Sequence, residues 1–198
     1  MTTKAEPTLT FSTVAEWEAW LAKHHDRASA VLLRIPKKKE SALTYSRALD
    51  AALAWGWIDS QKRALDASAW LQRFSPRTAR SPWSKINRAR AEALIASGAM
   101  KQPGFDEVAR ARADGRWARA YEGSRTAEVP ADLATALARN PRAHAFFDAL
   151  DRANRYAILY RVQAAKKPET RARRIEQFVA LCGAGRTIHP AREKTRRG

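Results

Sequence analysis

Strand-like hydrophobic runs occur only in the first part of this chain, and that restriction constrains the fold more than any other feature. Branched residues from Ala30 to Ile35, followed by Pro36, predict one strand. Residues 58–65 and 69–74 predict two more, and the turn-like sequence between them predicts a hairpin. Every later periodic segment repeats with the period of a helix. We therefore expect a short N-terminal sheet followed by a helical part.

One helix is predicted before the first strand and one after it. Each has an apolar face that can pack against a sheet. Thr13 and Glu16 have the spacing of a capping box, in which each side chain accepts a hydrogen bond from the other's backbone N–H. Apolar residues over 44–55 then follow the i, i+3, i+4, i+7 pattern, and Gly56 ends that segment.

Another helix is expected after the hairpin. Ser81 and Pro82 have the residue types of an N-cap and a first helical turn, so the sequence predicts a helix that reaches Gly98 and turns Trp83 and Ile86 inward. The remaining helices are expected at 105–113, at 131–139, from Asn140-Pro141 onward, from Asp151 to about residue 165, and from Pro168 to Gly183.

These elements predict an α+β protein with two folded parts. A small N-terminal α/β domain at residues 11–98 has a short sheet, a hairpin plus one strand, packed by helices. Residues 99–128 form a connector, and residues 129–187 form a helical C-terminal module. Residues 188–198 are expected to be a basic, disordered tail.

Composition excludes several classes of protein. Of 198 residues 45% are hydrophobic and seven are Trp, which is enough for a real core. The single cysteine, Cys182, excludes an intramolecular disulfide and a cysteine-based zinc site. The sequence starts without an apolar leader and has no stretch near the roughly 20 apolar residues of a membrane span, so a cytoplasmic location is expected.

Most standard catalytic motifs are missing as well. The four histidines lack metal-ligand spacing, and no G-x-S-x-G elbow, Walker A loop or dinucleotide fingerprint occurs. We expect no cofactor and no metal, and a binding protein is favoured over an enzyme. An enzyme that acts on a small phosphorylated or carboxylated substrate stays open as an alternative.

The net charge of +17 is concentrated in two zones. Residues 61–90 carry a net charge of +7 and residues 151–198 a net charge of +9. Between Trp70 and Arg90 six basic residues occur with no carboxylate among them. Such a one-signed segment sets up a positive field, which favours an anionic partner.

A candidate binding site follows from this segment and the residues before it. Asp59 lies between bulky rings in the sequence Trp55-Gly-Trp-Ile-Asp, where it can accept hydrogen bonds from a ligand or from a nearby arginine. The loop after the hairpin leads to a helix N-terminus, whose free N–H groups favour phosphate or carboxylate. The predicted ligand-binding residues are Trp55, Trp57, Asp59, Arg73, Arg77, Ser84, Lys85 and Asn87.

Structural interpretations of the same residues stay open. Asp59 can form an internal ion pair with Arg73 or Arg77 that fixes the hairpin, and Trp83 can be a core residue. Basic residues interleaved with aromatics are also typical of single-strand nucleic-acid binders, so a nucleic-acid-binding module that uses residues 73–90 and 166–174 is an alternative. The second zone has a secondary basic patch, which is equally consistent with a solvated helix face: Lys166, Lys167, Arg171 and Arg174.

Five ordered motifs carry a resemblance to a known family: Trp55-Gly-Trp-Ile-Asp59, Phe74-Ser-Pro-Arg77, Ser81-Pro-Trp-Ser-Lys-Ile-Asn87, Asp114-Gly-Arg-Trp117 and Ala164-Ala-Lys-Lys-Pro-Glu-Thr-Arg171. Together they resemble the YdeI/OmpD-associated family of bacteriocin-protection proteins, over about residues 11–190. The resemblance implies an α/β N-terminal part and a helical module at about 129–186. It also implies a role in stress and in protection against bacteriocins or cationic antimicrobial peptides, and it brings no agreed catalytic residues.

From the resemblance and the charge pattern together we derive one functional hypothesis. The protein is a cytoplasmic protection-associated protein that binds an anionic small molecule in a basic, Trp-lined pocket.

Overall fold

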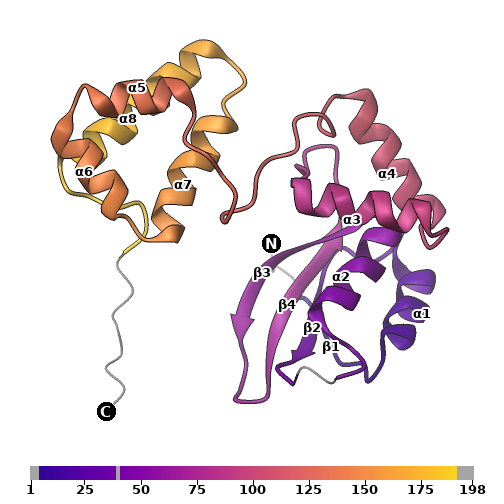
Figure 1. Ribbon diagram of the computed structural model, residues 1–198. Coiled ribbons are helices and arrows are strands. Elements are labelled where there is room, and N and C mark those ends of the chain that lie inside the picture. Colours follow the sequence, from indigo (N-terminus) through magenta and orange to yellow (C-terminus); the bar gives the residue numbers. More distant parts are fainter. Residues whose placement is uncertain (1–4, 39–40, 191–198) are drawn as a thin grey trace. The chain divides into compact units, whose positions relative to one another are not determined.

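The computed structural model describes residues 5–38 and 41–190. The chain divides into two compact units, Met1–Ala120 and Tyr121–Gly198 (Figure 1). The segment predicted to be a tail, 188–198, lies outside the described residues from position 191 onward. Each unit has its own cluster of buried apolar side chains, so each is described by itself.

The N-terminal unit contains a four-stranded sheet in the order β1-β2-β4-β3 (Figure 1). Strands β2 (Val31–Pro36), β3 (Trp57–Ala64) and β4 (Ala69–Pro76) match the three predicted strands, and β3 and β4 form the predicted antiparallel hairpin. The sequence did not predict β1 (Thr8–Leu9), which pairs in parallel with β2. Two residues are too few to show an alternating pattern, so nothing in the sequence indicated it.

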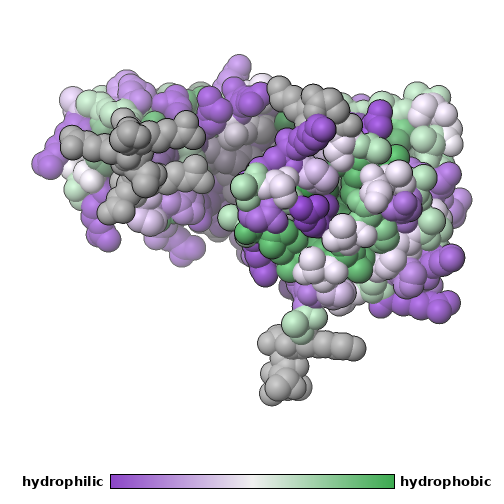
Figure 2. Space-filling view, turned by 90° about the horizontal axis from the view of Figure 1, so that it is seen from below, coloured by the Kyte–Doolittle hydropathy of each residue, from purple (hydrophilic) through white to green (hydrophobic). Residues whose placement is uncertain are grey.

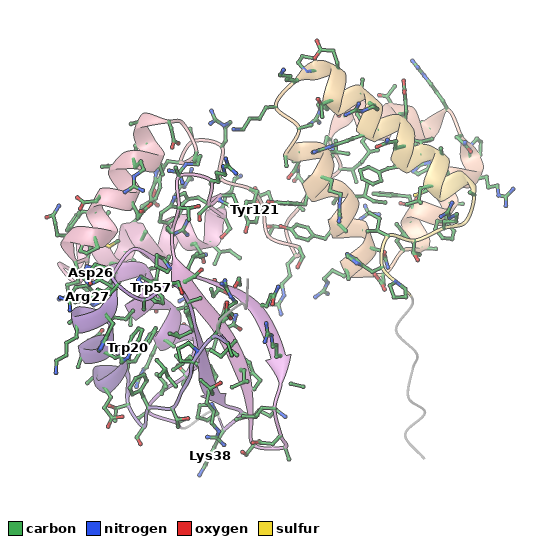
Figure 3. All side chains as sticks on the ribbon, turned by 180° about the vertical axis from the view of Figure 1, so that it is seen from behind. Trp20, Asp26, Arg27, Lys38, Trp57 and Tyr121 are labelled. Carbon is green, nitrogen blue, oxygen red and sulfur yellow. The ribbon has the colours of Figure 1, made fainter. Side chains whose placement is uncertain are left out.

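Helices α1 (Val14–His24) and α2 (Tyr45–Ala54) pack on one face of this sheet and enclose the core. Trp17 on α1 is completely buried, and its ring centroid lies 5.7 Å from that of Phe74 on β4. The indole N–H of Trp17 donates to the Ala48 carbonyl on α2 at 3.1 Å. Trp20 and Trp57, both visible in Figure 3, complete the cluster with an edge-to-face contact at 5.8 Å.

The cap of α1 is only partly the predicted one. The Thr13 hydroxyl accepts from the backbone N–H of Glu16 at 3.2 Å, as a capping box requires. The Glu16 carboxylate, however, accepts from the N–H of Ser12 at 2.7 Å, one residue before the cap. The Thr13 contact satisfies one of the N–H groups that a helix start leaves without partners, and the Glu16 contact ties the preceding residue to the same turn.

The predicted start of the next helix is wrong. Helix α3 spans Lys85–Ala96, and its N-cap is Ser84, whose hydroxyl accepts from the N–H of Asn87 at 3.1 Å. Ser81 instead closes a turn, because its hydroxyl accepts from the N–H of Thr78 at 2.9 Å. In this helix Asn87 is buried, whereas Ile86, which we expected inside, is 57% exposed.

Helix α4 (Gln102–Ala113) starts three residues before the predicted 105–113 and belongs to the N-terminal unit. It packs against α2 through Gly104, at which a Cβ would meet the Ala54 carbonyl oxygen at 2.4 Å. The chain after α4 returns to the same core, where Trp117 and Trp83 make an edge-to-face contact at 4.8 Å.

The C-terminal unit is helical, as predicted. It consists of α5 (Ala131–Ala138), α6 (Pro141–Ala149), α7 (Arg152–Gln163) and α8 (Pro168–Gly183). Asn140 and Asp151 cap α6 and α7 with their side chains, as the sequence indicated. Leu133, Phe147 and Ile158 lie at the centre of its own core. In Figure 2 hydrophilic residues dominate the visible surface of this unit, whereas the N-terminal unit also shows hydrophobic areas.

Candidate binding pocket

A pocket of about 190 Å³ opens in the N-terminal unit where α2 turns into β3. The ends of α1 and β4 and one side of α4 supply the rest of its wall. Three of the eight predicted ligand-binding residues, Trp55, Trp57 and Arg77, come together here. The other lining residues are His25, Gly56, Pro76, Pro103, Asp106, Glu107 and Arg110.

Gly56 shapes this pocket. Its φ of +73° lies in the left-handed region that glycine adopts at low cost, and it allows the chain to leave α2 and enter β3 directly. A Cβ here would also meet the Pro103 carbonyl oxygen at 2.8 Å, so only glycine permits the close approach of α4. The Gly56 carbonyl accepts from the N–H of Arg77 at 2.9 Å, which ties the end of β4 to the same point.

Arg77 holds the wall of the pocket together. The residue is only 5% exposed, its guanidinium carbon lies 3.5 Å from the centroid of the Trp83 ring, and Nη1 donates to the Pro82 carbonyl at 3.2 Å. A guanidinium stacked on an aromatic face is attracted by the ring's quadrupole. Arg77 therefore positions the loop before α3 in addition to lining the pocket.

Glu107, which the sequence analysis missed, is the most unusual lining residue. Its side chain is only 9% exposed, and Oε1 accepts from Nη1 of Arg110 at 2.9 Å. Within the described part of the chain Oε2 is buried without a hydrogen-bond partner. Burial raises the pKa of Glu107, and the nearby Arg110, Arg77 and Arg116 act in the opposite direction. The sequence did contain one signal that Glu107 is buried: on a helix it shares a face with the small residues Gly104 and Ala111.

The buried carboxylate makes stability depend on pH in a predictable direction. Because the folded pKa is raised, the folded state disfavours the charged form, and a stabilising contribution is lost as the pH rises above the ordinary value of 4.5. Glu107→Gln removes this titration. We expect the variant to gain stability relative to the wild type between pH 4 and pH 7, because only the wild type loses this contribution. Urea unfolding at both pH values measures the gain, and a constant difference between the two proteins would contradict it.

The two tryptophans of the pocket have different environments. Trp57 is buried, and its indole N–H donates to the His25 carbonyl at 3.1 Å. Trp55 is half-buried, with its ring centroid 4.9 Å from that of His25. The indole N–H of Trp55 is closed to solvent and, among the described residues, has no acceptor. It is therefore a donor whose hydrogen-bonding capacity is unused.

Asp59 and Arg73 do not line the pocket, and neither forms the ion pair considered from the sequence. The Asp59 carboxylate accepts from the hydroxyl of Tyr45 at 2.6 Å. Burial and this carboxylate raise the pKa of Tyr45, so the phenol stays protonated and donates. Arg73 pairs with Glu6 at 2.8 Å and also donates to the Ser60 hydroxyl at 3.3 Å.

The three predicted residues at the start of α3 are also absent from the pocket lining. Ser84 uses its hydroxyl as the helix cap, and the N–H of Asn87 is the group it satisfies. Lys85 is exposed at the first position of the helix. The structure thus brings the Trp-Gly-Trp turn and Arg77 into one pocket, and the three predicted residues at the start of α3 lie outside its lining.

Arginines of both basic zones take part in contacts within their own units. Arg90 binds Asp50 at 2.6 Å and Ser46 at 3.0 Å, while Arg88 lies 3.7 Å from Glu92. In the secondary patch Arg171 donates to both carboxylate oxygens of Asp132 and lowers the pKa of that group.

Arg171 and Arg174 also donate to carbonyls near the end of α7, those of Val162 and Arg161 respectively. Carbonyls in the last turn of a helix lack partners within it, so these contacts satisfy the end of α7. Lys166 and Lys167, the other two residues of the secondary patch, are exposed.

Over 5–38 and 41–190 no three His, Cys, Asp or Glu side chains are grouped as metal ligands would be. Within the same ranges, no helix has both the length and the apolar character needed to cross a membrane.

Comparison with protein families gives a match in each unit. Residues 9–107, which are 99 of the 198, match a family described as a domain of unknown function (DUF8412). Residues 126–185 match the family described as bacteriocin-protection, YdeI or OmpD-associated. Searches of curated proteins and of solved structures found no match.

Proposed function

We propose how this chain acts from two family matches: it belongs to the DUF8412 family through residues 9–107, and its residues 126–185 match the YdeI/OmpD-associated, bacteriocin-protection family. Its N-terminal unit binds a small ligand with an anionic group, in the pocket between the Trp55-Gly-Trp57 turn and α4. In this proposal the protein acts in the cytoplasm, and its part in bacteriocin protection depends on binding this ligand.

One observation carries this proposal: the pocket joins two tryptophans and two arginines in one concave surface. Small-molecule sites combine apolar or aromatic walls with a few polar groups that fix orientation. The Arg110 side chain is 49% exposed at the rim, so its guanidinium is accessible to an anionic group that enters from solvent.

The size of the pocket limits the ligand. At roughly 30 Å³ for each water molecule, a cavity of about 190 Å³ holds about six waters. Sites for drug-sized ligands usually measure about 300–1,000 Å³. A molecule the size of an amino acid fits, whereas a nucleotide does not. This size favours a small molecule over nucleic acid, and so do the internal contacts of Arg88, Arg90, Arg171 and Arg174 in the two basic zones.

Calorimetric titration of the full chain with small carboxylates tests the proposal. We expect saturable binding of propionate, 3-methylbutanoate or their 2-amino counterparts, because Arg110 and the Trp55 indole N–H both recognise a carboxylate. Arg110→Gln and Trp55→Phe should each weaken binding about tenfold, since each removes one polar contact to a charged group.

Arg88→Gln is the matched control, because this arginine is also partly exposed and paired with a glutamate but lies on α3 outside the pocket. It should bind like the wild type. If none of these carboxylates binds the wild type, or if Arg88→Gln weakens binding as much as Arg110→Gln, the proposed function is wrong.

A further inference from the structure

An anionic group alone does not account for the charges in this pocket. Its wall contains two arginines, Arg77 and Arg110, and two carboxylates, Asp106 and Glu107. A simple anion placed beside the arginines would also lie close to both carboxylates, and like charges at short range repel. The wall is thus complementary to a ligand that carries both signs of charge.

Glu107 identifies where the positive group belongs. This side chain is nine-tenths buried, yet Oε2 has no donor among the described residues. Leaving such an acceptor unsatisfied is costly, and more so for a charged group, so native proteins rarely retain one without a reason. A ligand ammonium group supplies the missing N–H donors and a compensating charge.

Trp55 identifies the place of the negative group. Trp55 lines the same pocket as Glu107, and its buried indole N–H is a donor with no acceptor among the described residues. The Arg110 guanidinium, which contacts the other oxygen of Glu107, is half exposed and can turn toward a ligand.

We infer that the pocket binds a zwitterion of the α-amino-acid class, with its ammonium group on Glu107 and its carboxylate on Trp55 Nε1 and Arg110. This inference rests on the proposed function and adds the class of ligand to it. Glu107 is then the residue that determines specificity, because it distinguishes an amino acid from the same carboxylate without the amino group. The side chain of the ligand faces the aromatic and proline surfaces of the pocket, which are contributed by Trp55, Pro76 and Pro103.

The test compares pairs of ligands that differ only in the amino group. Full-length protein is titrated calorimetrically, at one pH and ionic strength, with L-alanine against propionate and L-valine against 3-methylbutanoate. We expect each amino acid to bind at least about tenfold more tightly than its partner, since charge-assisted hydrogen bonds are about twice as strong as neutral ones. In Glu107→Gln this preference should disappear while binding of the carboxylates remains.

Glu92→Gln is the matched control, because Glu92 is a carboxylate on α3 that pairs with Arg88 outside the pocket. It should keep the wild-type preference. If the wild type binds each carboxylate as tightly as the matching amino acid, the zwitterion inference is wrong and the proposed function stands. If neither member of any pair binds, both are wrong. The wild-type comparison decides between these outcomes even if Glu107→Gln fails to fold.

Discussion

Replacing Trp17 by alanine is expected to destabilise the N-terminal unit by about 3–5 kcal/mol, the range typical of removing a large aromatic side chain from a core. Trp17 is completely buried and lies at the centre of a group of aromatic rings that includes Phe74 and Trp57. The variant also leaves the Ala48 carbonyl without the indole N–H that it accepts from. Urea unfolding followed by circular dichroism measures the loss.

Trp20→Ala is the control, because Trp20 stacks on Trp17 at 5.3 Å but is only half-buried. Its substitution should cost clearly less, since part of its surface already contacts water in the folded protein. Equal losses for the two variants would show that Trp17 is not the centre of this core.

Gly104→Ala should destabilise the same unit by about 3 kcal/mol, near the upper end for overpacking. Within a helix this change is usually favourable by roughly 0.5–1 kcal/mol, so the expected sign is reversed. The reason is the contact between α4 and α2, where a new Cβ would lie 2.4 Å from the Ala54 carbonyl oxygen and 2.9 Å from that of Leu53. Backbone atoms cannot turn aside as a side chain can, so α4 must move.

That movement also predicts an effect on the pocket, because Glu107 and Arg110 lie on α4. Gly104→Ala should therefore weaken ligand binding as well as stability. Gly183→Ala is the control: its nearest neighbour is the end of the flexible Asn140 side chain, at 3.3 Å. This second variant should change stability by less than about 1 kcal/mol, and a loss as large as that of Gly104→Ala would contradict the explanation.

Local signals predicted most of this fold, and non-local contacts account for what they missed. Asn140 and Asp151 cap their helices as expected, because a cap is decided by three or four neighbouring residues. Near α3, by contrast, both Ser81 and Ser84 have the residue type of an N-cap, and the local sequence does not distinguish them. The helix starts after Ser84, and Trp83 is buried in the segment before it. Strand β1 exists only through its pairing with β2, which no local pattern reveals.

The pocket residues divide in the same way, into those that local sequence signals indicate and those that depend on contacts between distant segments. Trp55, Trp57 and Arg77 share a pocket because the Gly56 carbonyl binds the Arg77 N–H, a contact that follows from the predicted hairpin. The partners of Asp59 and Arg73 lie on elements distant in sequence, Tyr45 and Glu6, and residue type alone does not identify them. Glu107 was missed because a Glu three residues before an Arg on a helix usually indicates an exposed ion pair.

The central claim is that this pocket binds a small carboxylate-bearing molecule, and the indole N–H resonances of the seven tryptophans test it most directly. Labelled full-length protein is titrated with L-valine and followed by two-dimensional NMR. We predict a saturable shift of the Trp55 resonance, with a smaller one for Trp57, while Trp17 and Trp83 stay unchanged because neither lines the pocket. An unchanged Trp55 resonance at millimolar L-valine and 3-methylbutanoate, or equal shifts at all tryptophans, would contradict the claim.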